Sequence, residues 1–264
     1  MTQQIQVGVF GGSGFYSLLD DAREVPVDTP YGRPSAPVVV GEIEGRSVGF
    51  MPRHGLKHDL PPHQINYRAN LWAMKHLGAT DVILPCAAGS LNADVKPGQF
   101  VLCDQVVDRT SGRPDTFFDG PITTHISFAD PYDEQMRETA IASASELGIP
   151  VHERGTIVVI QGPRFSTRAE SKWFQRMGWE VINMTQYPEV ILARELEMAA
   201  LNISLITDYD AGLDGVDADA VSHAAVLEVF QANNAKLRDL LFHLVPRLPL
   251  SPDRPALRAL QGAR

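Results

Sequence analysis

Two aspartates close an apolar run in the stretch SLITDYDAG, residues 204–212. Leu205 and Ile206 are typical of a buried strand, and Asp208 and Asp210 follow with one residue between them. Side chains at positions i and i+2 of an extended chain point to the same side. Burial beside a second carboxylate raises a carboxyl pKa. At the end of a strand, where the ligand sites of α/β proteins gather, the pair is a candidate for an acid or a hydrogen-bond acceptor that handles a leaving group.

A basic pair follows another apolar run, in MPRHG over residues 51–55. Arg53 carries a fork of N–H donors that fits the oxygens of a phosphate, and His54 stands next to it. Taken alone, the pair fits a solvated loop about equally well. At the end of a strand it indicates a cationic anion site.

Two stretches of small residues allow a ligand to approach backbone N–H groups. GGSG, residues 11–14, contains Ser13, and CAAGS, residues 86–90, begins with Cys86 and Ala87. The glycines complete neither a dinucleotide-binding pattern nor a nucleoside-triphosphate loop. On the glycines alone, a plain turn is the better interpretation of GGSG, and close packing of a turn is the alternative for CAAGS.

Hydroxyl side chains begin two of the expected helices. Ser166 lies in QGPRFSTRAES, residues 161–171, and Thr185 lies in VINMTQYPE, residues 181–189. Serine and threonine cap helix N-termini, so capping competes with ligand binding at both positions. The sequence leaves these alternatives open.

Strands and helices alternate along the chain, and these elements must position the candidate residues. Strand-like runs cover 5–10, 38–43, 47–51, 81–86, 99–108, 155–162, 180–184 and 202–208. Helix-like spacing covers 66–78, 133–148, 167–178, 188–198 and 220–245. This order predicts a single α/β domain with a twisted, mixed, mostly parallel sheet flanked by helices. We expect this domain to cover 1–246, with a loosely attached tail over 247–264, and 109–130 to form a functional loop.

The bulk composition excludes several classes of protein. The 264 residues carry a formal charge of −9 and are 44% hydrophobic, which predicts a folded core and argues against binding to nucleic acid or a membrane surface. The cysteines Cys86 and Cys103 are expected to be buried thiols, and no metal site is expected. No signal peptide or membrane span is visible, which predicts a cytoplasmic protein.

A set of strings spread over the chain resembles the S-methyl-5′-thioadenosine phosphorylases, the trimeric branch of the purine nucleoside phosphorylase family. They are GGSGF, PRHG, NYRANLWA, AAGSL, DRTSGRPDTFFDG, GPRFSTRAES, INMTQYPE and TDYDAG. The resemblance runs from about Val7 to Pro246. It implies phosphorolysis of 5′-methylthioadenosine to adenine and 5-methylthioribose 1-phosphate. It further implies a homotrimer that uses inorganic phosphate as co-substrate and needs no metal or organic cofactor.

The resemblance also implies roles for single residues. The phosphate-binding positions are matched by Ser13, Arg53, His54 and Thr185, with the backbone at Cys86 and Ala87. Met184 matches a ribose-contacting position. The base-recognition positions are matched by Ser166, Asp208 and Asp210. His125 matches a histidine that reaches the 5′ group of the neighbouring subunit's substrate.

The two aspartates acquire separate tasks under this resemblance. A protonated Asp208 near purine N7 would stabilise the departing base, and Asp210 would accept a hydrogen bond from the 6-amino group. A 6-oxopurine would present an acceptor to that carboxylate and be disfavoured.

His223 departs from the family pattern. It falls near a position where these phosphorylases place a small apolar residue against the methylthio group, whereas ordinary purine nucleoside phosphorylases have a histidine near the 5′-hydroxyl. A histidine on a long helix is as often a packed or exposed side chain. If His223 lines the pocket, adenosine or another 5′-substituted adenosine competes with the methylthio substrate.

Two other classes of function fit parts of the sequence less well. In a hydrolytic nucleosidase water would replace phosphate, but Arg53, His54 and Ser13 favour phosphate. A nucleotide-binding module built on GGSG would carry an acidic residue about 20 positions after its glycines. Asp28 lies only about 14 positions beyond Gly14, so this reading is the weaker one.

Overall fold

The computed structural model describes residues 4–11, 20–213 and 222–263 of the chain. Ser13, one of the expected phosphate-binding residues, lies outside the described residues.

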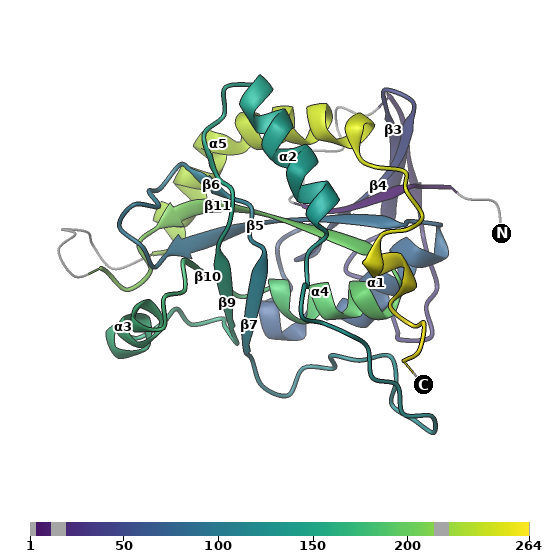
Figure 1. Cartoon of the computed structure of the whole chain (residues 1–264), viewed down its shortest axis with the longest axis horizontal. Coiled ribbons are helices and arrows are strands. Elements are labelled where there is room, and N and C mark those ends of the chain that lie inside the picture. Colours follow the sequence, from purple (N-terminus) through teal and green to yellow (C-terminus); the bar gives the residue numbers. More distant parts are fainter. Residues whose placement is uncertain (1–3, 12–19, 214–221, 264) are drawn as a thin grey trace.

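An 11-stranded sheet runs through the described part of the molecule (Figure 1). Its main path is β2–β3–β4–β1–β5–β10–β9–β7, while β11 pairs with β5 and β6, and β8 pairs with β6. In chain order the strands are β1 (Val7–Gly11), β2 (Asp20–Val25), β3 (Val38–Ile43), β4 (Arg46–Pro52), β5 (Asp81–Ser90), β6 (Phe100–Val101), β7 (Gln105–Arg109), β8 (Val151–His152), β9 (Thr156–Ile160), β10 (Val181–Asn183) and β11 (Ala199–Asp208).

Both parallel and antiparallel pairs occur in this sheet. β1 is parallel to β4 and β5, β11 to β5, β9 to β10 and β7, and β6 to β8. The hairpin β3–β4 is antiparallel, as are the pairs β2–β3, β10–β5 and β11–β6. The predicted fold class, a mixed and mostly parallel sheet, is confirmed.

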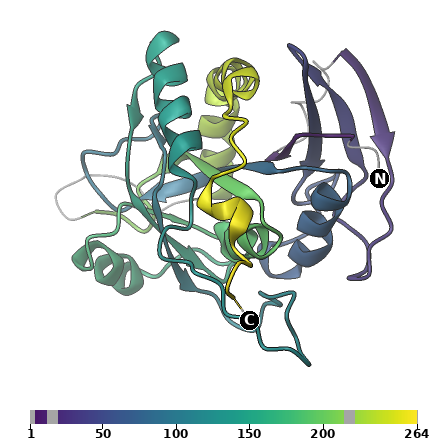
Figure 2. The same cartoon turned by 45° about the vertical axis from the view of Figure 1, so that its right-hand side comes forward.

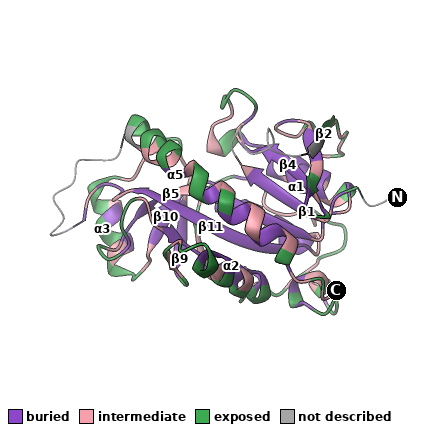
Figure 3. Ribbon diagram, turned by 90° about the horizontal axis from the view of Figure 1, so that it is seen from above, coloured by how far each residue is buried: buried purple, intermediate pink, exposed green. Residues whose placement is uncertain are grey.

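Helices cover both faces of the sheet. α1 (Tyr67–His76) and α4 (Gln186–Glu195) lie on one face, and α2 (Glu134–Glu146) and α5 (His223–Leu244) lie on the other (Figures 1 and 3). Their apolar residues belong to two separate buried clusters, one on each face. α3 (Arg168–Arg176) follows the loop after β9, and short 3-10 turns cover Pro62–Gln64, Val245–Arg247 and Pro255–Arg258.

Capping residues fix where three of the helices begin. Asn66 precedes α1, and its side chain accepts a hydrogen bond from the Ala69 N–H. Asp133 precedes α2, and its side chain accepts from the Met136 N–H. Thr167 and Glu170 form a capping box at α3, in which each side chain accepts from the other's backbone N–H. Such caps each contribute about 1 kcal/mol.

The strand expected over 99–108 is two strands. β6 pairs with β11 and β8, whereas β7 pairs with β9, and the residues between them carry the chain from one neighbour to the other. Strand β5 is longer than expected because Gly89 and Ser90 pair with antiparallel β10.

The C-terminal segment, residues 247–263, is docked more firmly than the expected loose tail. Arg254 is 1% exposed, and its Nη1 lies 2.5 Å from Asp81 Oδ1 and 3.7 Å from Asp133 Oδ1. Figure 2 shows this segment, in yellow, running from the end of α5 toward the loop below, where the His125 N–H donates to Ala263 O at 2.9 Å. The division into a domain over 1–246 and a separate tail stays a prediction.

None of the helices within the described ranges is long and apolar enough to cross a membrane.

Candidate active site

Strand β5 joins the two halves of the candidate site. Cys86 lies within this strand, and Gly89 lies opposite Asp208 of β11. Three residues of extended chain span about 10 Å. Antiparallel β10 pairs Ile182 with Gly89 and then runs back along β5 toward Cys86. The anion-binding candidates therefore gather near Cys86 and the carboxylates near Gly89, a separation that suits the length of a nucleoside.

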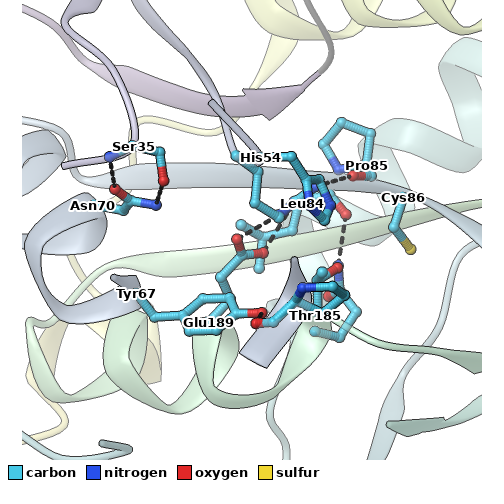
Figure 4. Close-up of polar contacts among 12 residues, drawn as sticks. Ser35, His54, Tyr67, Asn70, Leu84, Pro85, Cys86, Thr185 and Glu189 are labelled. Atoms are coloured by element: carbon cyan, nitrogen blue, oxygen red, sulfur yellow. Dashed lines mark hydrogen bonds and ion pairs between the residues drawn. The ribbon is translucent and has the colours of Figure 1, made fainter. Parts of the chain in front are cut away.

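Arg53 follows β4 directly and pairs with Glu189 of α4. Its Nε lies 2.5 Å from Glu189 Oε1, its Nη2 lies 3.0 Å from Oε2, and its Nη1 donates to Pro85 O at 3.0 Å. Figure 4 labels these partners, Glu189 and Pro85, in one close-up with Cys86 and Thr185. Arg53 is 5% exposed and Glu189 is fully buried. Among the described residues these contacts use three of the five guanidinium N–H donors, and the other two can meet an anion.

Glu189 changes the electrostatics expected of the basic pair. Burial acts to lower the pKa of Arg53, but the attraction of Glu189 raises it overall, and the carboxylate offsets the arginine charge. Burial lowers the pKa of His54 to about 4. Its Nδ1 lies 2.9 Å from Leu60 O, a pure acceptor, so Nδ1 carries the proton. The sequence predicted a cationic pair. In the structure the charge of Arg53 is offset by Glu189, and His54 is neutral.

The sequence allowed the Thr185 and Ser166 hydroxyls to be either helix caps or ligand-binding groups, and neither caps one of the described helices. Thr185 stands at the N-cap position of α4, yet its side chain makes no cap hydrogen bond within the described residues. Asn183 Nδ2 lies 3.4 Å from its Oγ1. At α3 the cap is Thr167, and Ser166 Oγ is buried without a partner in the part of the chain that the structure describes. Both hydroxyls can therefore meet a ligand.

Met184 packs over the turn after β9. A Cβ built on Gly162 would lie 2.7 Å from Met184 Sδ, and Gly162 has a φ of +62°. The left-handed backbone favours glycine there, and the flexible Met184 side chain lies against it.

Asp208 ends strand β11 with both carboxylate oxygens engaged. The Thr207 hydroxyl donates to Oδ2 and the Asp210 N–H donates to Oδ1, each at 2.7 Å. Burial raises the pKa of Asp208, and these two donors partly oppose the shift. The raised pKa agrees with the expected proton donor, although its cause is burial rather than a second carboxylate. A Cβ on Gly89 would lie 2.9 Å from Asp208 Oδ1, so glycine makes room for the carboxylate.

Asp210 lies in a turn and not on an extension of the strand. Its φ of +48° is left-handed, so the i and i+2 alternation expected over TDYD ends at Asp208. Asp210 is 3% exposed, and its Oδ2 finds no hydrogen-bond partner among the residues described. Burial raises its pKa, while Ser171 and Ser166 act to lower it. The Ser166 hydroxyl is close enough to affect this pKa but does not reach hydrogen-bond geometry with Oδ2. A buried acceptor without a donor fits a ligand that brings an N–H.

The two histidines expected at the 5′ end of the substrate lie in different places. His223 begins α5, is exposed, and has its ring centroid 6.2 Å from that of His58, which stacks on His54 at 4.5 Å. His125 is exposed on the loop after β7 and lines a cavity of about 480 Å³ with the C-terminal segment. His223 therefore approaches the anion half of this chain's site, whereas His125 belongs to a separate surface.

Sequence reasoning missed Glu189, Arg113 and Gly89 as parts of the site. A lone acid inside the apolar run PEVILA was the available signal for Glu189, because buried acids are usually paired. Arg113 and Gly89 stand within strings already singled out, but nothing in their spacing indicated their contacts. The ligand-binding roles of all the site residues stay predictions.

The family follows from comparison with known proteins. The Phosphorylase superfamily matches residues 6–246. The chain therefore belongs to the phosphorylase superfamily, whose purine nucleoside branch consists of pentosyltransferases.

Similar proteins within that family carry two names. A purine nucleoside phosphorylase of Streptomyces coelicolor is 50% identical over 97% of this chain and 95% of its own length. An S-methyl-5′-thioadenosine phosphorylase of Thermofilum pendens is 47% identical over 99% of both chains. Among solved structures, methylthioadenosine phosphorylase from Schistosoma mansoni in complex with adenine superposes with a TM-score of 0.91 at 34% identity, covering 98% of this chain and 99% of that one. A methylthioadenosine phosphorylase from an antarctic soil metagenomic library reaches 0.93 at 36% identity, covering 99% and 92%.

Proposed function

We propose that this chain catalyses the phosphorolysis of S-methyl-5′-thioadenosine to adenine and 5-methylthioribose 1-phosphate. The observation that carries the proposal is the division of the site along β5. Arg53, Cys86 and Thr185 gather at one end, and two buried carboxyl groups gather at the other. The names of the relatives point to the same substrate class.

Phosphate would bind at the Arg53 end and attack the sugar at C1′. The two unused N–H donors of Arg53, the Thr185 hydroxyl, the His54 backbone, Ser13 and the N–H groups at Cys86 and Ala87 would hold its oxygens. As the C1′–N9 bond breaks, positive charge grows on the sugar and negative charge on the base. The phosphate faces the sugar cation, stabilises it, and forms the new C1′–O bond.

Asp208 would supply the proton that neutralises the departing base at N7. Its pKa is raised by burial, which favours the protonated form that this task requires. Met184 would contact the ribose between the phosphate and the base.

Asp210 and Ser166 would select the base. The unpartnered Oδ2 of Asp210 can accept from the 6-amino group of adenine. In a 6-oxopurine the 6-oxygen would face the Asp210 carboxylate oxygen. Two buried acceptors would then lack a donor, which disfavours binding of that base.

In a homotrimer, His125 of a neighbouring subunit would contact the 5′ group of the substrate. The region around His223 of this chain would contact the same group. His223 is the reason for a second candidate function. In that function the chain is a purine nucleoside phosphorylase that acts on adenosine or other 5′-substituted adenosines. The observation that favours it is the approach of this histidine to His58 and His54, together with the name of the Streptomyces coelicolor relative.

The reaction as proposed uses inorganic phosphate as co-substrate and calls for no metal or organic cofactor. Cytoplasmic location, the homotrimer and the absence of nucleic-acid or membrane partners belong to the same proposal and stay predictions.

The test is adenine release from methylthioadenosine, adenosine, 5′-deoxyadenosine and inosine, with and without phosphate. We expect phosphate-dependent release that is fastest with methylthioadenosine. Faster turnover of inosine would overturn the base assignment, and undiminished release without phosphate would indicate a hydrolase.

A further inference from the structure

Arg113 lies in the loop after β7, within the string DRTSGRPDTFFDG, and is almost completely buried at 8% exposure. Its guanidinium donates hydrogen bonds to Tyr187 O at 2.6 Å, Gln161 O at 2.7 Å, Met184 O at 3.0 Å, Gln161 Oε1 at 3.2 Å, Tyr67 Oη at 3.3 Å and Ile160 O at 3.4 Å. The function proposed above gives this side chain no task.

The acceptors belong to the segments that carry the sugar and phosphate contacts. Met184 and Tyr187 flank Thr185 at the start of α4, and Gln161 precedes the glycine over which Met184 packs. One rigid fork therefore fixes the turn after β9 and the turn after β10 relative to each other. A lysine ammonium carries only three donors and cannot reproduce this planar pattern.

Arg113 also brings a positive charge that its own hydrogen bonds do not neutralise. Its acceptors within the described residues are carbonyl, amide and phenol oxygens, all uncharged. The nearby Glu189 is already engaged by Arg53 in a bidentate pair. Asp108 also attracts Arg113, but it is exposed and solvent screens its charge. Among the buried groups, Arg53, Arg113 and Glu189 therefore leave one net positive charge beside Thr185.

We propose that Arg113 is a positioning residue of the phosphate and ribose subsite, which holds Met184 and Thr185 in place and supplies the positive charge that Glu189 removes from Arg53. Arg113 does not itself touch the substrate. The inference rests on the proposed function for the identity of the two ligands, but the anion-binding part can be measured with inorganic phosphate alone.

The experiment compares Arg113→Met, which loses charge and fork, with Arg113→Lys, which keeps the charge. Arg109→Met is the matched control, because Arg109 is an exposed arginine of β7 that lies over the Trp173 ring. Inorganic phosphate is titrated calorimetrically into each protein, and kcat and KM are measured for phosphate and methylthioadenosine. For Arg113→Met we expect phosphate Kd and KM to rise at least tenfold and kcat to fall. For Arg113→Lys we expect phosphate Kd to recover to within about threefold while kcat stays low.

Four results would each overturn part of the inference. Phosphate binding and kcat within twofold of wild type in both variants would remove any positioning role. Equal loss of phosphate binding in both variants would refute the charge argument, and equal loss in Arg109→Met would show a general effect of loop charge. If Arg113→Met does not fold, the lysine variant still decides, because normal kcat in it would refute the need for the fork. Failure of the proposed function is separate, because wild-type protein would then release no adenine with phosphate.

Discussion

Asp208→Asn removes the proton donor at the base end of the site while keeping its shape. The amide has no proton to transfer to N7, although its N–H can still donate a hydrogen bond. General acid catalysis contributes about 10²–10⁴ in rate. We therefore expect kcat for methylthioadenosine to fall by about 10²–10⁴, which corresponds to about 2.7–5.4 kcal/mol of transition-state stabilisation at 1.36 kcal/mol per decade.

The same substitution is expected to change binding and stability far less. The Asp208 carboxyl accepts from the Thr207 hydroxyl and the Asp210 N–H, and an amide has one oxygen for these two donors. Leaving one donor unmatched costs about 1–3 kcal/mol of folding free energy. Urea unfolding measures that loss, and adenine release at saturating phosphate gives kcat and KM separately. We expect KM for methylthioadenosine to change less than about threefold.

Thr207→Val is the matched control, because it keeps the carboxyl and removes one donor to it. That hydrogen bond lowers the pKa of Asp208, so its loss raises the pKa further. An acid that must be protonated loses activity as pH rises through its pKa, and the fall in kcat of Thr207→Val should lie at higher pH than in wild type. A folded Asp208→Asn protein with kcat within threefold of wild type would refute the general-acid role.

Three further substitutions test the base pocket, the close approach at β5 and the docked C-terminal segment. Asp210→Asn should lower the preference for methylthioadenosine over inosine by at least about tenfold in kcat/KM, because an amide can donate to a 6-oxygen. Gly89→Ala places a Cβ 2.9 Å from Asp208 Oδ1, and the displaced carboxyl should cost about 10² in kcat. Arg254→Met strands the buried Asp81 carboxylate and should lower the free energy of unfolding by about 3–5 kcal/mol in urea titrations.

Each of these has a control or a contradicting result. An unchanged inosine rate in Asp210→Asn would place base selection elsewhere, and normal kcat in Gly89→Ala would mean that Asp208 moves freely. Arg258→Met breaks the exposed Arg258–Asp253 pair and should change stability by no more than about 1 kcal/mol. Equal losses of unfolding free energy in Arg254→Met and Arg258→Met would contradict the claim that the buried Arg254–Asp81 pair contributes more to stability than the exposed pair.

The layout of the fold was largely predictable because its elements follow local patterns. β5 and β11 are apolar runs buried along their length, which is typical of strands covered on both faces. What the patterns could not give was pairing between distant segments. The run over 99–108 is continuous in apolar character, yet its halves pair with different neighbours. The two carboxylates that pair with Arg254, Asp81 and Asp133, likewise lie far away in the sequence.

The site was predictable by residue type and less so by state of charge. The spacing of Arg53 and His54 indicated an anion site, but the carboxylate that offsets Arg53 arrives from α4, 136 positions later. The desolvation of His54 likewise depends on tertiary packing. Alternation predicted that Asp208 and Asp210 share a side, and the left-handed φ of Asp210 replaced that geometry with a turn.

The central claim is phosphate-dependent cleavage of a 6-aminopurine nucleoside by two groups of residues, one near Cys86 and one near Gly89 of β5. The most direct measurement is adenine release from methylthioadenosine over a series of phosphate concentrations, with inosine in parallel. The account predicts saturable dependence on phosphate, formation of 5-methylthioribose 1-phosphate in equal amount, and little or no hypoxanthine from inosine. Release of adenine that is independent of phosphate, or faster release of hypoxanthine, would contradict it.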